Sequence, residues 1–193
     1  MKKSKGKNTG KWMALFIAVV MVSSIGGYVI VDSSSSSAFE YNGYEFEREE
    51  NGYSTEVKGV RVMFHYLPAD IDHIEVSGKQ TRLIRNAGGL RMTSDVNSTL
   101  QQAISLFEFE IENHFARLGK LATHGFTEEN SNNLTVITCG DANQENPVIY
   151  IKEGESTSVD TEDACIIVTA KNQYDVIKVK DAILYRSLGI IEE

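Results

Sequence analysis

Cysteine and proline are scarce in this chain of 193 residues, which has two of each. Two cysteines are too few for a disulfide-dense scaffold, and two prolines with fifteen glycines exclude collagen-like and low-complexity compositions. With 41% hydrophobic and 24% charged residues, the composition is instead typical of a folded protein. The length accommodates one ordinary domain of about 100 to 150 residues and an additional segment.

The sequence motifs of common catalytic and metal sites are also missing. The chain contains no G-x-S-x-G, no H-E-x-x-H and no glycine-rich phosphate-binding loop. No two of its four histidines lie four residues apart, and its cysteines are not at metal-ligand spacing; the histidines are His65, His73, His114 and His124. We therefore assign no catalytic residue, no cofactor and no metal site from the sequence.

Positive charge is concentrated before residue 12, where five of the 19 basic residues lie. Of the 27 acidic residues, 26 follow position 38, so the part from residue 39 onward has a net charge of −12. Such a domain repels phosphate backbones, and we predict that it does not bind nucleic acid. Its acidic surface favours cationic partners or simply keeps the domain soluble.

Residues 12–31 form an uncharged run of twenty residues. As a helix this run would be about 30 Å long, which matches the hydrocarbon thickness of a bilayer. Five lysines precede it, so residues 1–11 are predicted to be a cytoplasmic leader and residues 12–31 a single transmembrane helix. The serine-rich residues 32–38 would then be a linker, and residues 39–193 an extracytoplasmic domain in the cell envelope.

Two alternatives to a permanent anchor remain open. The small residues Ser36, Ser37 and Ala38 would suit cleavage of a signal peptide, although the apolar run is longer than the usual 7 to 15 residues. Gly10, followed by Lys11-Trp12-Met13, resembles the leader of type IV pilin-like subunits, which implies a filament subunit. The small residues at positions 14, 18, 23 and 27 would also permit self-association of the membrane helix.

The domain is predicted to belong to the α+β class. Alternating apolar and polar residues from Phe39 to Tyr66, with Asn-Gly turns at Asn42 and Asn51, indicate a β-meander. Further strands are expected at 74–76, 83–87, 134–138, 148–151 and 166–170. Two amphipathic helices, one beginning at a capping box at Ser98 and one running from Asn172 to Leu188, would pack on the sheet and form a mixed α/β sandwich.

Cys139 and Cys165 are predicted to form a disulfide, because both follow the membrane segment and would lie in an oxidising compartment. A nucleophilic Cys139 is the alternative, but no histidine is recognisably placed to activate it. Asn97 and Asn133 each begin a glycosylation sequon on the exported side, so both are possible glycosylation sites.

Four side chains of the predicted helices are placed unusually. Leu106 and Phe109 lie opposite the apolar arc of the first helix, where a second layer of the fold or another chain would cover them, and both are possible partner contacts. In that helix His114 falls inside the apolar arc and is interpreted as a core histidine with one hydrogen bond. In the second helix Lys180 lies in the apolar arc, where its stem would reach to solvent. If Lys180 were instead buried against a carboxylate, it would be the first candidate for a functional site.

The segment 166–191, with Asp181-Ala182-Ile183-Leu184-Tyr185 and Leu188-Gly189-Ile190, resembles uncharacterised membrane-anchored proteins of small-genome archaea. That resemblance implies placement at a membrane and no activity. The sequence as a whole favours a non-enzymatic binding or scaffolding module that contacts another envelope protein or itself. An exported hydrolase that uses carboxylates is the alternative, and the pilin-like filament subunit is the third.

Overall fold

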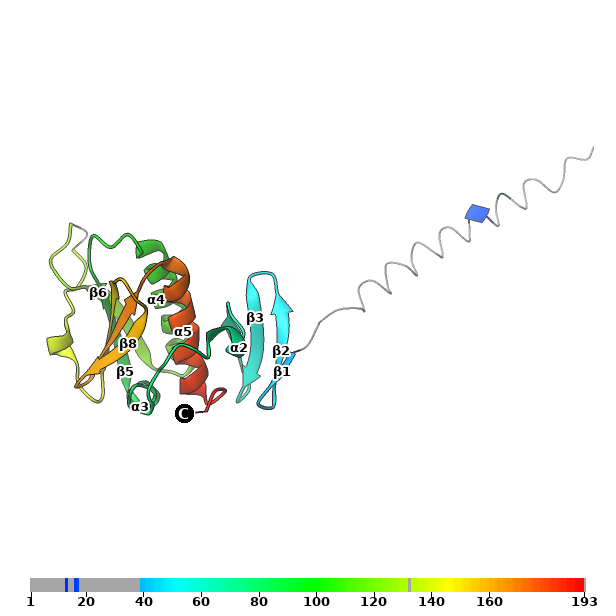
Figure 1. Cartoon of the computed structure of the whole chain (residues 1–193), viewed down its shortest axis with the longest axis horizontal. Coiled ribbons are helices and arrows are strands. Elements are labelled where there is room, and N and C mark those ends of the chain that lie inside the picture. Colours follow the sequence, from blue (N-terminus) through cyan, green and yellow to red (C-terminus); the bar gives the residue numbers. More distant parts are fainter. Residues whose placement is uncertain (1–12, 14–15, 18–38, 132, 193) are drawn as a thin grey trace, which may run out of the picture. The chain divides into compact units, whose positions relative to one another are not determined.

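The computed structural model describes residues 39–131 and 133–192, together with Met13, Phe16 and Ile17 (Figure 1). Apart from those three residues, the predicted leader 1–11, membrane helix 12–31 and linker 32–38 lie outside the described residues. Within the described part of the chain, no helix combines the length and the apolar composition that crossing a bilayer requires.

The described chain begins with the predicted β-meander, an antiparallel sheet of four strands in the order β1-β2-β3-β4. The strands are β1 (Phe39–Tyr41), β2 (Tyr44–Glu49), β3 (Gly52–Val57) and β4 (Val60–Phe64). Asn42 and Gly43 both have positive φ angles, of 48° and 79°, as a tight hairpin turn requires. Gly52 begins β3 at φ 146°, where a Cβ would lie 2.1 Å from the carbonyl oxygen of Phe64.

The second sheet has five strands in the order β6-β5-β7-β9-β8. They are β5 (Gly89–Ser94), β6 (Leu121–Phe126), β7 (Val148–Glu153), β8 (Ser158–Glu162) and β9 (Cys165–Ala170). β5, β6, β7 and β9 are parallel, and only the edge strand β8 runs antiparallel. The two strands predicted from continuous apolar runs, β7 and β9, are buried inside this sheet, in agreement with the sequence interpretation.

Four helices accompany the sheets. Two are short, α2 (Pro68–Ile71) and α3 (Gly78–Asn86), and two are long, α4 (Gln101–Arg117) and α5 (Gln173–Leu188). Asn172 caps α5 by accepting a hydrogen bond from the amide of Asp175, and Gly189 ends it at φ 78°, both as predicted. A 3₁₀ turn, η1 (Cys139–Asp141), lies in the long connection between β6 and β7.

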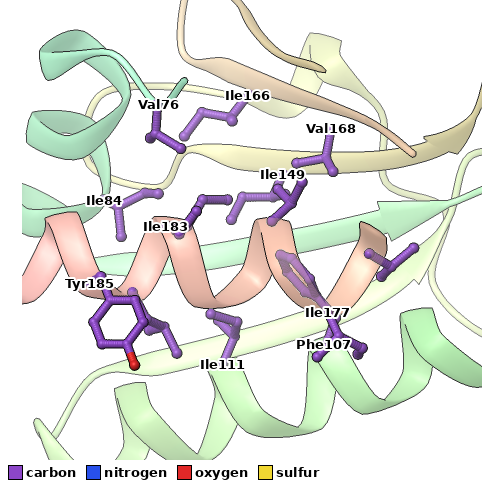
Figure 2. Packing of buried hydrophobic residues seen from close by; sticks show 14 of the residues in the cluster. Val76, Ile84, Phe107, Ile111, Ile149, Ile166, Val168, Ile177, Ile183 and Tyr185 are labelled. Atoms are coloured by element: carbon purple, nitrogen blue, oxygen red, sulfur yellow. The ribbon is translucent and has the colours of Figure 1, made fainter. Parts of the chain in front are cut away.

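α5 lies between the meander and the five-stranded sheet (Figure 1). Its residues from Val179 to Arg186 are all buried, because one side of the helix faces each sheet. Figure 2 shows Ile183 directed toward Ile149 of β7, whereas Tyr185 lies on another side of the same helix. Buried residues of the meander, the helices and the five-stranded sheet form one continuous core, so the described chain from residue 39 is a single domain of the α+β class.

The far face of the five-stranded sheet is covered by the connection between β6 and β7. Ile137 of this connection packs against Val148 and Cys165 in a second, smaller core. The side chain of Thr93 donates a hydrogen bond of 2.7 Å to the carbonyl oxygen of Ile137. The predicted strand 134–138 is therefore wrong: this segment forms only one isolated bridge, between Phe126 and Val136.

Several other predicted elements need correction. The expected strands at 74–76 and 83–87 are wrong, because the first has no regular structure and the second belongs to α3 and its C-cap. Ser77 and Gln80 form a capping box that starts α3. Strands β5, β6 and β8 were not predicted; β6 and β8 are edge strands with largely exposed side chains, whereas β5 lies inside the sheet and is mostly buried.

The predicted capping box at Ser98 does not form. α4 begins only at Gln101, and Glu153 of β7 accepts hydrogen bonds from the amides of Thr99 and Leu100. The apolar arc of α4 is buried as predicted, except that Leu118, beyond the last helical residue, is exposed.

Candidate functional site

Lys180 is completely buried in the middle of α5, with 0% of its surface exposed. The prediction that its stem reaches to solvent is wrong, because α5 is covered on both sides. Its Nζ forms ion pairs with Oδ1 of Asp181, at 2.6 Å, and with Oε2 of Glu110 on α4. Lys180 is thus buried against two carboxylates, and it is therefore the first candidate for a functional site, as the sequence analysis anticipated for this case.

Asp181 connects this lysine to the meander. Its Oδ2 accepts hydrogen bonds from the backbone amides of His65 and Tyr66, at 2.8 and 2.9 Å. Both amides belong to the segment that follows β4. Burial raises the pKa of the Asp181 carboxyl, and Lys180 together with the two amide donors opposes that rise.

Glu110 uses both carboxylate oxygens within the same cluster. Oε2 binds Lys180, and Oε1 lies 2.9 Å from Nε2 of His65. Burial alone would raise the pKa of Glu110, but the hydrogen bond from His65 and the charge of Lys180 outweigh it and hold the pKa below its usual value. Glu110 is therefore ionised at neutral pH.

The four side chains of His65, Glu110, Lys180 and Asp181 are named the latch here. A buried ion pair is tolerated when additional hydrogen bonds satisfy its remaining polar atoms, and the amides of His65 and Tyr66 supply them to Asp181. The latch joins β4, α4 and α5. Asp181 and Lys180 are completely buried, so the latch holds these layers of the fold together.

A second titratable cluster lies on α4, beside β6. Glu108 is only 7% exposed, and burial raises its pKa to about 7. Nδ1 of His124 lies 2.6 Å from a carboxylate oxygen of Glu112, and this hydrogen bond raises the pKa of His124. Protons can therefore bind and leave here near neutral pH, but none of the pockets described below is lined by these three residues.

A groove runs between the meander and α4. At one end is a small pocket of about 200 Å³, lined among others by Met63, Phe109, Glu110 and Arg117. At the other end is a large pocket of about 440 Å³, between the β3–β4 turn and the C-terminal ends of α4 and α5. The two pockets adjoin, because Val62, His114 and Leu184 line both, and together they are called the groove here. A single carboxylate, Glu110 of the latch, lines this groove.

His114 lies where the two pockets meet. It is buried as predicted, with 8% of its surface exposed, but the predicted hydrogen bond is wrong: its ring packs edge-on against Phe115 and has no hydrogen bond to the described residues. Burial and the nearby Arg117 lower its pKa, so the imidazole is neutral at pH 7. Its ring nitrogens are therefore available to a molecule in the groove.

Leu106 and Phe109, the predicted partner contacts, are both exposed, at 37% and 62%. Only Phe109 lines the groove, together with Met63, another exposed apolar side chain. Sequence reasoning missed the basic residues of the groove because they come from three distant stretches of the chain, and these residues are Lys58, Arg61, Arg85, Arg117 and Lys120.

The carboxyl ends of β5 and β7 are the place where open parallel sheets commonly bind ligands. Here Glu153 occupies the N-terminus of α4, where an anion would otherwise bind. Next to it, the hydroxyl of Tyr150 donates a hydrogen bond of 2.7 Å to Asp95, which together with burial raises the pKa of Tyr150 to about 12. The chain's own side chains thus fill this position.

The predicted disulfide is confirmed: Cys139 and Cys165 are bonded, with their Cα atoms 5.2 Å apart. It ties the connection before β7 to the start of β9, and it excludes a free nucleophilic Cys139. Asn97 and Asn133 are both exposed, so neither sequon is hindered by burial.

No group of three or more His, Cys, Asp or Glu side chains among the described residues is arranged to hold a metal ion. No protein-family model matches the chain, and comparison with curated proteins and with solved structures finds no significant match.

Proposed function

We propose that the protein is a non-enzymatic binding module of the cell envelope, anchored through residues 12–31, and that it binds its ligand in the groove between the meander and α4. The observation that carries this proposal is the groove itself, with exposed Phe109 and Met63 at one end and a pocket of about 440 Å³ at the other. A pocket of this volume, largely apolar with a few polar groups, is typical of a binding site.

The latch supports a binding role over a catalytic one. A carboxylate-dependent hydrolase needs two carboxyl groups that both reach the substrate. Glu110 borders the small pocket, but its oxygens are held by His65 and Lys180, and Asp181 is fully buried. The latch instead fixes the two walls of the groove, because it joins β4 to α4 and α5. A preformed groove lowers the entropic cost of binding.

The membrane placement is supported by the sequence of residues 1–38 and is tested separately. Protease added to intact cells is expected to digest the domain from residue 39 onward. Protection of that domain in intact cells, with digestion after lysis, would contradict an exported domain.

Binding in the groove is tested by placing the photoreactive residue p-benzoylphenylalanine at position 109 of the full-length protein. Irradiation of intact cells is expected to give a covalent adduct of defined mass, detected by mass spectrometry. The matched control carries the same residue at position 174, because Tyr174 is an exposed aromatic residue on α5 outside the groove. We expect no adduct there.

A blocking variant completes this experiment. Asn113 is exposed and lines the small pocket, so Asn113→Trp fills part of the groove without entering the core. We expect it to abolish the adduct at position 109. Identical adducts at positions 109 and 174, or an adduct that persists in the blocked variant, would refute the groove as the binding site.

A further inference from the structure

The floor of the large pocket is apolar. Val57, Val62, Ile84 and Phe115 are nearly fully buried in the core, and each also lines this pocket. Val60, Leu118 and Leu188 complete its walls. The apolar chain of a ligand in contact with these residues would be removed from water, which favours binding.

The rim of the large pocket is basic, although the domain as a whole is strongly acidic. Lys58, Arg85 and Lys120 line it, and none of its lining residues is an aspartate or a glutamate. Arg85 and Lys120 donate hydrogen bonds to backbone carbonyl oxygens rather than to carboxylates. Lys58, in the β3–β4 turn, has no ion pair or hydrogen bond to the described residues. These three cations repel one another, so an anion among them would be stabilising.

His114 adds a polar group at the bottom of the same pocket. It is more than nine-tenths buried, lines the pocket and makes no hydrogen bond to any described residue. A ligand atom that hydrogen-bonds to the imidazole would lie close to Arg117, which lines the adjoining small pocket.

We infer that the large pocket binds a small anionic amphiphile, a molecule with one apolar chain and a single carboxylate or phosphate head group. The chain would lie on the apolar floor, and the head group would be bound by Lys58, Arg85 and Lys120. This inference rests on the proposed function, because it names the class of ligand that the groove takes. The same chemistry could come from a free amphiphile or from an anionic lipid.

The test uses the full-length protein in nanodiscs of zwitterionic lipid, with empty nanodiscs as the blank. Calorimetric titration is expected to show binding of octyl phosphate and octanoate. Octyltrimethylammonium and inorganic phosphate are expected not to bind at the same concentrations, since the first has the wrong charge and the second lacks the chain. Equal binding of the cationic amphiphile, or binding of inorganic phosphate as tight as that of octyl phosphate, would overturn the inference.

Variants identify the residues that bind the head group. Lys58→Asn removes a charge while keeping a residue that tolerates the positive φ of 52° at this position, and Lys120→Gln removes a second. We expect each to weaken octyl phosphate binding about fivefold, the effect of about 1 kcal/mol. The matched controls Lys79→Gln and Lys171→Gln, which replace exposed lysines outside the pocket, should leave it unchanged. Unchanged affinity in both pocket variants would refute the assigned head-group site.

Two further comparisons complete the test. The first separates failure of the ligand class from failure of the groove, and the second separates a lipid from a free amphiphile. If no amphiphile binds but the photo-adduct at position 109 persists, the ligand class is wrong and the groove remains a binding site; if neither is observed, both proposals fail. Nanodiscs that contain phosphatidylglycerol distinguish the sources, because competition with octyl phosphate indicates a lipid and no competition indicates a free amphiphile. Either of these last two results supports an anionic amphiphile.

Discussion

The ring of Phe64 on β4 stacks on the ring of Tyr185 on α5, with centroids 3.9 Å apart and planes 8° from parallel. The hydroxyl of Tyr185 also donates a hydrogen bond of 2.7 Å to the carbonyl oxygen of Tyr66. This contact lies beside the latch, since Asp181, one turn earlier on α5, binds the amides of His65 and Tyr66. Stacking, hydrogen bonding and ion pairing therefore all fasten the meander at one place.

Tyr185→Phe keeps the stacking but leaves the carbonyl of Tyr66 without its donor. We expect it to lower the free energy of unfolding by about 1 kcal/mol, whereas Phe64→Ala should cost about 3 to 5 kcal/mol because it opens a cavity. Urea denaturation measures both. Tyr174→Phe, at an exposed tyrosine, is the control and should have no effect; equal losses in all three variants would contradict the assigned contact.

Lys180→Met leaves Asp181 and Glu110 without their shared cation. We expect a loss of about 3 to 5 kcal/mol in the free energy of unfolding, as is usual when one partner of a buried ion pair is removed. Adding Glu110→Gln should recover part of this loss, since it removes one of the unpaired charges. Lys171→Met, at an exposed position, should change little. If the free energy of unfolding of Lys180→Met equals that of the wild type, the latch contributes no net stability.

The contribution of Glu108 to stability is expected to fall as the pH rises from about 4.5 to about 7. The folded state raises the pKa of Glu108 from 4.5 to about 7, so between these values the folded chain retains a proton that the unfolded chain has released. The raised pKa of His124 acts in the same direction at higher pH. Glu108→Gln should remove about 1 to 3 kcal/mol of this pH dependence.

The measurement is the difference between wild-type and Glu108→Gln unfolding free energies from pH 5 to 8.5. Using the difference cancels the opposing contribution of His114, whose lowered pKa costs stability as the pH falls below 6.5. Glu128→Gln, at an exposed carboxylate, serves as the control. Parallel curves for the wild type and Glu108→Gln would rule out a shifted Glu108.

Replacing both cysteines with alanine should lower the free energy of unfolding by about 3 kcal/mol, because the disulfide closes a loop between positions 26 residues apart. The native protein should resist a thiol-reactive probe until reductant is added. Ready labelling of both cysteines without reductant would contradict the bond.

The elements predicted correctly from the sequence are those with clear turn or capping residues at their ends. The meander has turn residues at its breaks, and α5 has Asn172 at its start and Gly189 at its end. The disulfide followed from the predicted compartment and from the small number of cysteines. In α3, by contrast, the apolar residues Leu83 and Ile84 favour a strand when considered alone, whereas the capping box at Ser77 identifies a helix.

The latch and the groove could not be predicted because they depend on which layers meet. On a helical wheel, Lys180 differs in no way from a lysine whose stem reaches solvent; only the meander, packed on the second side of α5, buries it. Likewise, Lys58, Arg85 and Lys120 come from a turn, a helix and a loop that are far apart in the sequence. Patterns within one element do not contain such information.

The position of α5 between two sheets also constrains when the protein can fold. Neither sheet can bury its apolar face while residues 173–188 remain inside the ribosome or a translocation channel. Until then the meander and the parallel strands expose apolar surfaces that favour aggregation with neighbouring nascent chains. We therefore expect the domain to mature in one late step after release of α5, with a holding chaperone protecting it beforehand.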